Sequence, residues 1–185
     1  PGGLLFDPLV EGDTITFQSA GLYHASCQIV QTGYKDPTPA PVTVVAGAAE
    51  EVQTEVDPTT LTSGESALVA CSGTDAYENP VTNEWDITVV PAGSAPGPVN
   101  GLIEMNQAIT GIKEGTYDVA CLHATGALDE SPVPVSVYHG LPDKIVTTLE
   151  NPTIQAGQAT SVSCHTEDKH GNVIYDLPLS IQLDE

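Results

Sequence analysis

The sequence is poor in the residues that nucleic-acid binding and membrane insertion require. It has no arginine, and only four lysines stand against 25 acidic residues, which gives a formal net charge of −21. Such a field repels nucleic acids and anionic membrane surfaces, so we expect neither as a partner. No apolar run approaches the roughly 18 residues of a membrane span, and the first residues lack the pattern of a signal peptide.

Motifs of catalysis and of helix formation are missing as well. No nucleophile motif, glycine-rich phosphate loop or His-Glu-x-x-His sequence occurs, so we expect no enzymatic activity. Helical periodicity is also absent, whereas short β-branched runs alternate with turns that contain glycine or proline. The sequence therefore predicts an all-β fold.

An internal repeat is the most informative feature that the sequence does contain. Residues Gly115–Cys121 read GTYDVAC, and residues Gly21–Cys27, 94 positions upstream, read GLYHASC. Cys71 likewise has a counterpart 93 positions downstream, at Cys164. The two offsets agree within one residue, which indicates a repeat of about 93 residues.

The repeat divides the chain into three segments. Residues 47–140 form one complete repeat, residues 1–46 match its second half, and residues 141–185 match its first half. Gly47 and Gly140 stand at the borders, and we expect them to act as short linkers. The complete repeat has about seven short predicted strands with frequent turns, which is typical of an immunoglobulin-like sandwich.

The complete repeat resembles the bacterial immunoglobulin-like domains that are strung along invasin- and intimin-type adhesins. The resemblance rests on the order Cys71, Trp85, Cys121, on Asp-x-x-x-Asn-x-Val after the first cysteine and on Gly-x-Tyr-x-Val before the second. It implies tandem β-sandwiches of about 93 residues with one disulfide each, and core positions for Trp85, Tyr117 and Tyr23. Tyr117 stands four residues before Cys121, whereas the corner tyrosine of antibody-type domains stands two residues before the cysteine.

The third segment departs from this pattern at the tryptophan. It offers Tyr175 near the place that matches Trp85. Residues 179–183 are predicted to form the strand that matches residues 86–90.

All four cysteines stand at repeat-matched positions, which favours disulfides and a secreted or cell-surface location. We expect Cys71 to pair with Cys121. The alternatives are a reduced buried pair and a zinc site, and the absence of a close Cys-x-x-Cys pair argues against zinc. Cys27 and Cys164 belong to the two partial repeats, so each is expected to pair with an equivalent of the other.

Three arrangements would complete the partial repeats, because an isolated half-sandwich exposes its core face and its strand edges. The chain is a window on a longer tandem array with flanking repeats, or residues 141–185 are completed by residues 1–46 of the next copy. In the third arrangement the two partial repeats of one chain meet. A head-to-tail contact between copies does not close and therefore grows a fibre.

Acidic turns are the candidate sites for a small ion, because calcium takes oxygen ligands. Such turns are more often simple Asx turns, so no cofactor is expected. His24 and His165 adjoin the cysteine strands at outward positions, where a solvated imidazole is expected. The calcium candidates are Asp75, Glu78 and Asn79, then Glu167, Asp168 and Asn172, and the linker residues Glu50, Glu51 and Asp143.

We therefore expect a structural, non-enzymatic protein that forms an extracellular fibre, sheath or stalk from disulfide-stapled sandwiches arranged end to end. The alternative is an adhesin or carbohydrate-binding surface module that uses the pole loops 33–41 and 91–101.

Overall fold

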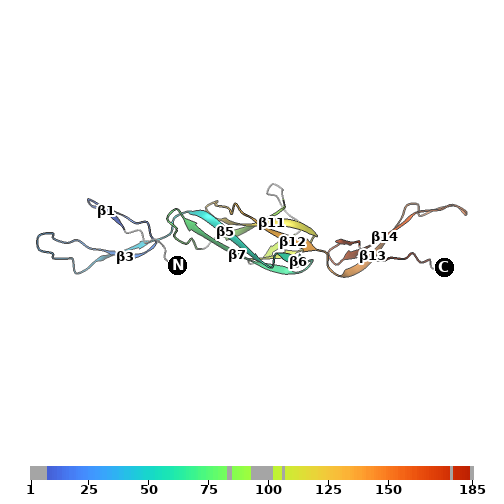
Figure 1. Ribbon diagram of the computed structural model, residues 1–185, viewed down its shortest axis with the longest axis horizontal. Coiled ribbons are helices and arrows are strands. Elements are labelled where there is room, and N and C mark those ends of the chain that lie inside the picture. The colour runs from blue at the N-terminus through green and yellow to red at the C-terminus, as the bar shows by residue number, and fades with distance from the viewer. Residues whose placement is uncertain (1–7, 83–84, 93–101, 106, 176, 184–185) are drawn as a thin grey trace. The chain divides into compact units, whose positions relative to one another are not determined.

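The computed structural model describes residues 8–82, 85–92, 102–105, 107–175 and 177–183. Throughout these residues the chain forms strands and turns and no helix, which confirms the predicted all-β class (Figure 1). The strands are β1 (Leu9–Glu11), β2 (Thr14–Thr16), β3 (Gly21–Ala25), β4 (Ala40–Val44), β5 (Ala49–Asp57), β6 (Thr60–Thr62), β7 (Ser66–Asp75), β8 (Trp85–Pro91), β9 (Leu102–Met105), β10 (Ala108–Gly111), β11 (Gly115–His123), β12 (Val133–Tyr138), β13 (Pro142–Leu149), β14 (Val162–Asp168) and β15 (Val173–Ile174).

The strands assemble into two four-stranded sheets and three smaller ones. The larger sheets have the strand orders β5-β7-β10-β9 and β6-β12-β11-β8. In the second of these, β12 pairs antiparallel with β11 and parallel with β6. The smaller sheets are β1-β2, β3-β4 and β13-β14-β15.

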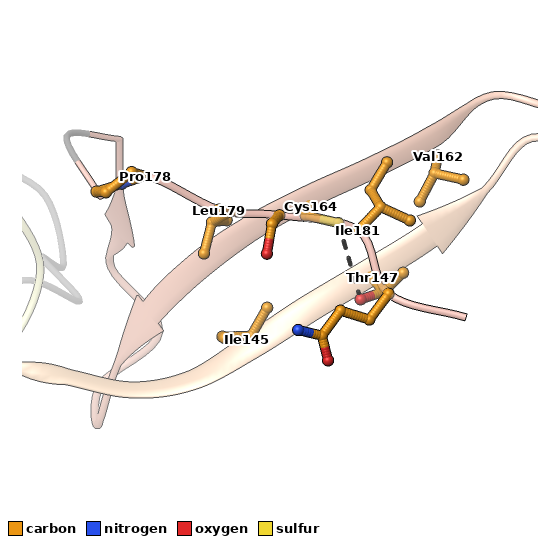
Figure 2. Close-up of a pocket in the computed structure, with 9 residues that line it drawn as sticks. Ile145, Thr147, Val162, Cys164, Pro178, Leu179 and Ile181 are labelled. Carbon is orange, nitrogen blue, oxygen red and sulfur yellow. Dashed lines mark hydrogen bonds between the residues drawn. The ribbon is translucent and has the colours of Figure 1, made fainter. Parts of the chain in front are cut away.

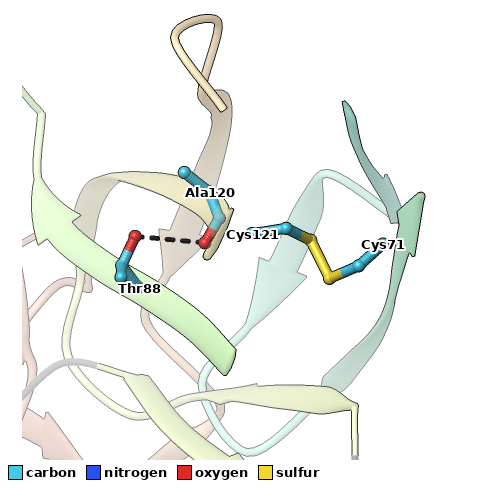
Figure 3. The surroundings of a disulfide bond; sticks show 4 residues. All are labelled: Cys71, Thr88, Ala120 and Cys121. Carbon is cyan, nitrogen blue, oxygen red and sulfur yellow. Dashed lines mark hydrogen bonds between the residues drawn. A yellow bond between two sulfur atoms is a disulfide. The ribbon is translucent and has the colours of Figure 1, made fainter. Parts of the chain in front are cut away.

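A disulfide links the two larger sheets, as predicted from the cysteine spacing. It joins Cys71 on β7 to Cys121 on β11, with the two Cα atoms 5.7 Å apart (Figure 3). Cys121 is fully buried, and so is Val119 two residues earlier on the same face of β11. Two sheets of mainly antiparallel strands that a disulfide links in this way have the architecture of an immunoglobulin-like sandwich.

The chain divides into two compact units, which are described separately. The borders predicted at 46/47 and 140/141 remain a prediction. The first unit consists of residues 1–53, 71–86 and 121–130, and the second of residues 54–70, 87–120 and 131–185.

In the first unit, the indole of Trp85 is half buried and packs edge-on against His123, with the ring centroids 4.8 Å apart. Gly73 makes this packing possible. A Cβ atom at Gly73 would lie 2.5 Å from the carbonyl oxygen of Glu51 and 2.8 Å from the indole. The core position predicted for Trp85 is therefore a partly exposed one.

In the second unit, the core consists of aliphatic side chains that alternate with exposed residues along their strands. This alternation buries one face of each strand and leaves the other face to solvent. The fully or nearly fully buried residues include Leu61, Ala67, Val69, Ile109, Val119, Val135 and Val137.

The two partial segments reproduce strand pairings of the middle segment without its burial. Tyr23 lies opposite Val42 in the β3–β4 pair, and Tyr117 lies opposite Val135 in the β11–β12 pair. Tyr117 and Val135 are buried, whereas Tyr23 and Val42 are half exposed. The same local sequence therefore gives the same hairpin, with less burial of its inward-facing side chains.

Two predictions for the third segment are wrong. Tyr175 does not replace the tryptophan, because 84% of its surface is exposed. Residues 179–183 do not form a strand. In the middle segment β8 borders β11, and no such neighbour accompanies residues 179–183 among the described residues.

We expect the Cys71–Cys121 disulfide to be a major source of stability. It closes a loop of 50 residues, and in the chain-entropy model such a loop is worth about 4 kcal/mol. The double variant C71A/C121A should lower the free energy of unfolding by about that amount, measured by urea denaturation. Reducing agent should destabilise the natural chain and leave the variant unchanged; equal sensitivity of both would contradict the prediction.

Candidate functional site

The most distinctive polar feature of the chain is a pair of hydrogen-bonded turns that we call the first and second turn networks. Each follows a strand that ends in an aspartate, and each contains an asparagine four residues later. The first turn network comprises Asp75, Asn79, Gly47, Gln18 and Ala20, and the second comprises Asp168, Asn172, Gly140, Ile112 and Glu114.

In the first turn network, Asp75 holds its own turn closed. Its Oδ1 atom accepts the N–H groups of Tyr77 and Asn79, each at 2.9 Å. The Asn79 side-chain amide also donates to both carboxylate oxygens, at 3.1 and 3.0 Å. Aspartate favours such turns because its short side chain reaches the backbone a few residues ahead.

The same turn reaches two distant parts of the first unit. The second carboxylate oxygen of Asp75 accepts the N–H group of the predicted linker residue Gly47 at 2.7 Å. Asn79 donates its side-chain amide to the carbonyl of Gln18 and accepts the N–H group of Ala20, both at 2.7 Å. One aspartate and one asparagine thus fix the linker and the loop before β3.

The second turn network repeats most of these bonds within the second unit. It differs in that the Asn172 side-chain amide donates to one carboxylate oxygen of Asp168, at 2.8 Å, and also to Ser63 Oγ, at 3.0 Å. Asp168 accepts the N–H group of Gly140 at 2.8 Å, and it also accepts the N–H groups of His170 and Asn172. Asn172 donates to the carbonyl of Ile112 at 2.8 Å and accepts the N–H group of Glu114 at 3.0 Å. Apart from Ser63, every partner lies 93 or 94 positions after its counterpart in the first network.

The two predicted core tyrosines brace the loops that these asparagines hold. The hydroxyl of Tyr23 donates to the carbonyl of Ser19 at 2.8 Å, and the hydroxyl of Tyr117 donates to the carbonyl of Lys113 at 2.9 Å. Each bond reaches four residues upstream. The tyrosine-corner hydrogen bond therefore forms although the spacing to the cysteine is longer than in antibody-type domains.

The second network has further contacts from β6 and its following turn. Ser63 Oγ donates to the carbonyl of Ile112 at 2.9 Å and lies 2.7 Å from His170 Nδ1. Lys113 Nζ donates to the carbonyl oxygens of His170 and Gly171. These bonds tie the turn after β14 to the turns around β6 and β10.

The carboxylate of Asp168 stays ionised although it is almost completely buried. Burial alone would raise the pKa of Asp168, but hydrogen bonds from Asn172 and from the N–H groups of Gly140 and His170 outweigh it and hold the pKa far below its usual range. The pKa of Asp75 is also lowered: burial opposes the shift, and the bonds from Gly47, Asn79 and Tyr77 outweigh it.

Five of the nine calcium candidates already have hydrogen-bond or ion-pair partners, and the other four are exposed: Glu50, Glu51, Glu78 and Asp143. The oxygens of Asp75, Asn79, Asp168 and Asn172 accept N–H groups, and Glu167 pairs with Lys144 at 2.8 Å. Over the described part of the chain, no group of three histidine, cysteine or acidic residues has the geometry of a metal site.

The histidines predicted to be solvated differ in their surroundings. His24 is exposed, whereas His165 is half buried and its Nε2 lies 3.0 Å from Glu167. Of the predicted pole loops, residues 33–41 are largely exposed, and residues 93–101 of the other loop lie outside the described residues.

A second candidate site is the open face of the β13-β14-β15 sheet. A cavity of about 410 Å³ lies on it, lined mainly by Ile145, Thr147, Val162, Cys164, Leu179 and Ile181 (Figure 2). The thiol of Cys164 is unpaired within the chain, and so is the exposed thiol of Cys27. The expected pairing of these two cysteines with partners outside the same copy stays a prediction.

Comparison with solved structures shows a likeness of fold. One similar chain is FdeC, described as a broadly conserved Escherichia coli adhesin, with a TM-score of 0.54 and 20% identity over 82% of this chain and 52% of that one. Another is InvD of Yersinia pseudotuberculosis, with a TM-score of 0.53 and 16% identity over 86% of this chain and 53% of that one. The chain thus spans about half the length of either.

No family model and no curated protein matches the sequence. None of the described residues belongs to a helix long and apolar enough to cross a membrane.

We expect Asp168→Ala to loosen the second turn network. The variant leaves the N–H groups of Gly140, His170 and Asn172 without their acceptor, and a hydrogen bond to a charged group is worth about 1.5–3 kcal/mol. Amide exchange of Gly140 should accelerate about 10- to 100-fold in hydrogen–deuterium exchange. Asp143→Ala, which removes an exposed carboxylate three residues after Gly140, is the matched control; equal acceleration in both variants would contradict the assignment.

The low pKa of Asp168 predicts that the second turn network resists acid. An aspartate with a lowered pKa stabilises the fold at any pH above its unfolded value of about 3.9, and this stabilisation is lost only as the pH falls through the folded pKa. After correction for intrinsic exchange, protection of Gly140 should stay constant from neutral pH to about 4 and decline below it. Asp168→Asn removes the titrating group and should abolish this decline; loss of protection well above pH 4 would refute the idea.

Proposed function

We propose that this chain is a structural, non-enzymatic run of tandem immunoglobulin-like sandwiches from a secreted or cell-surface shaft. The observation that carries the proposal is the recurrence of one turn network at an interval of 93–94 residues. Both networks use an aspartate, an asparagine, a linker glycine and a tyrosine-braced loop. A recurring joint of fixed geometry is what a stiff tandem array requires.

The bonding of these joints supports a mechanical role. Each joint buries a carboxylate whose partners are N–H groups rather than lysines, so salt should screen it only weakly. The linkers are short, and each is bonded directly to the sandwich that follows it. Such a joint restrains bending between neighbouring sandwiches, as a shaft that holds a binding tip away from a cell surface requires.

The disulfide and the charge support the proposed location. A cysteine pair that staples the sandwich persists in oxidising surroundings outside the cytosol. The net charge of −21 keeps shafts soluble and apart from one another. The fold likeness to the adhesin FdeC is an analogy that agrees with this location.

A second candidate function is recognition by the loop between β3 and β4. Its tip exposes Ile29, Val30 and Tyr34, of which Val30 is 95% exposed. Exposed apolar side chains at a loop tip are a usual means of contacting a partner. The loop does not recur in this form in the middle segment, where the matching positions carry His123, Ala124 and Leu128.

Small-angle X-ray scattering tests the shaft proposal. With its free thiols alkylated, the natural chain should give one narrow pair-distance distribution that does not change between low and high salt. The variant D75A/D168A removes both joint carboxylates and should broaden that distribution and shorten the mean end-to-end distance. The matched control is E50A/D143A, which removes two exposed carboxylates near the same linkers. A natural chain as broadly distributed as D75A/D168A would refute a mechanical role.

A further inference from the structure

The open face of β13 and β14 has apolar side chains at positions where the middle segment has core residues. Val52 and Val69 are 8% and 3% exposed, and their counterparts 93 positions later are Ile145, which is 63% exposed, and Val162, which is half exposed. Both counterparts line the cavity on this face, which residues 178–182 cross as an unpaired segment and which no strand of the described residues covers (Figure 2). Large side chains in such a pattern mark a surface that is built to be covered.

The β3–β4 sheet has the complementary face. Tyr23, Val42 and Val44 correspond to Tyr117, Val135 and Val137, which are buried in the middle segment. All three are only half buried in the β3–β4 sheet. Cys27 corresponds to Cys121 and is exposed as a free thiol.

Strand order shows how the two faces fit together. In the middle segment the second sheet runs β6-β12-β11-β8, so the β11–β12 pair lies between β6 and β8. The counterparts of β6 and β8 in the third segment are residues 153–155 and 179–183, and neither forms a strand. The counterpart of the β11–β12 pair is the isolated β3–β4 sheet, whose two edges are both unpaired.

We propose that the open face of residues 142–183 binds residues 14–45 of a second copy of this chain. This inference rests on the proposed function and names its partner. The β3–β4 sheet of the second copy lies between residues 153–155 and 179–183 of the first and covers Ile145 and Val162. About ten partly exposed apolar side chains take part, which bury on the order of 1,000 Å², the size that a specific interface needs.

The proposed contact also brings together two cysteines that can form a disulfide between the copies. Cys71 and Cys121 form a disulfide in the middle segment, and their counterparts on the two faces are Cys164 of one copy and Cys27 of the other. A small-molecule disulfide such as oxidised glutathione accepts the two electrons. The two protein thiols lose their protons, one sulfur–sulfur bond forms, and two molecules of glutathione thiol are released.

The contact joins different surfaces of the two copies, so it does not close on itself. Each chain has one open β13–β14 face and one β3–β4 sheet. Copies joined in this way form a head-to-tail chain that grows at both ends. A complementary pair of faces also explains why one free thiol lies on β14 and the other directly after β3.

Two single-cysteine variants test the proposal with the full chain. C27S keeps only the Cys164 thiol, and C164S keeps only the Cys27 thiol, while both keep the Cys71–Cys121 disulfide. Each variant alone under oxidised glutathione should stay monomeric on non-reducing gels. Their equimolar mixture should form a covalent dimer and stop there, whereas the natural chain should form a ladder. Peptide mass spectrometry should find Cys27 joined to Cys164.

Docking should make the mixed disulfide fast. An effective thiol concentration in the millimolar range, against about 10 µM of protein, predicts cross-linking about 100-fold faster than between undocked chains. Ile145→Asp places a charge on the covered face and should remove this acceleration. Thr148→Asp, on an exposed position of the same strand, is the matched control and should keep it.

Each remaining outcome overturns the contact. These outcomes are dimers of either variant alone, an intrachain Cys27–Cys164 disulfide in monomers, a mixture that stays monomeric, and equal rates for the two aspartate variants. Gel filtration of the variant C27S/C164S, which cannot form the disulfide and adds no bulk to the contact, separates this failure from failure of the shaft proposal. If the protein is monomeric in gel filtration and rigid in X-ray scattering, the shaft proposal is supported and the contact with a second copy is contradicted.

Discussion

One buried carboxylate in each turn network determines how neighbouring parts of the chain are joined. Burying an aspartate is costly unless both of its oxygens are bonded. Asp75 and Asp168 meet this condition by collecting N–H groups from their own turn and from a linker glycine. A shift of the linker would take away the glycine N–H group and leave a buried carboxylate oxygen without this hydrogen-bond donor. The turn and the linker must therefore move together. The asparagine extends the same constraint to the loop before the next tyrosine strand.

The composition explains why the buried carboxylates are bonded to backbone N–H groups and not to cationic side chains. With four lysines and no arginine, the chain has few cations for its 25 acidic residues. N–H groups satisfy the buried carboxylates without any charged partner, and their bonds are held in place by the turn itself. The ion pair of Lys144 and Glu167 contributes little, because the lysine side chain is 58% exposed, although that of Glu167 is only 18% exposed. The exposed acidic residues therefore favour solubility, while the two buried aspartates hold the turns and the linker glycines in position.

Much of this architecture could be predicted from the sequence, because it depends on residue types at fixed intervals. Cysteine spacing indicated the Cys71–Cys121 bond, and the repeat singled out Gly47 and Gly140, whose N–H groups Asp75 and Asp168 accept; their role as linkers stays a prediction. The turn networks could not be predicted in full, since two of their partners are the carbonyls of Gln18 and Ile112, and a carbonyl is common to every residue. Asp-x-x-x-Asn could equally have been read as a calcium loop. The strand predicted at residues 179–183 was wrong because strand propensity depends on the residues of the segment alone. A strand forms only where a neighbouring strand completes its hydrogen bonds.

That dependence of strands on neighbours also accounts for the behaviour of the partial segments. Residues 153–155 and 179–183 have counterparts that are strands in the middle segment, and they differ from these by lacking an adjacent β-pair rather than by an unfavourable composition. An isolated two-stranded sheet such as β3–β4 is marginal in water for the same reason. In the contact that we propose between copies, each piece supplies hydrogen-bonding edges and an apolar face to the other. The net charge of −21 disfavours unspecific association of copies, so the proposed contact requires that apolar burial and edge pairing outweigh this repulsion.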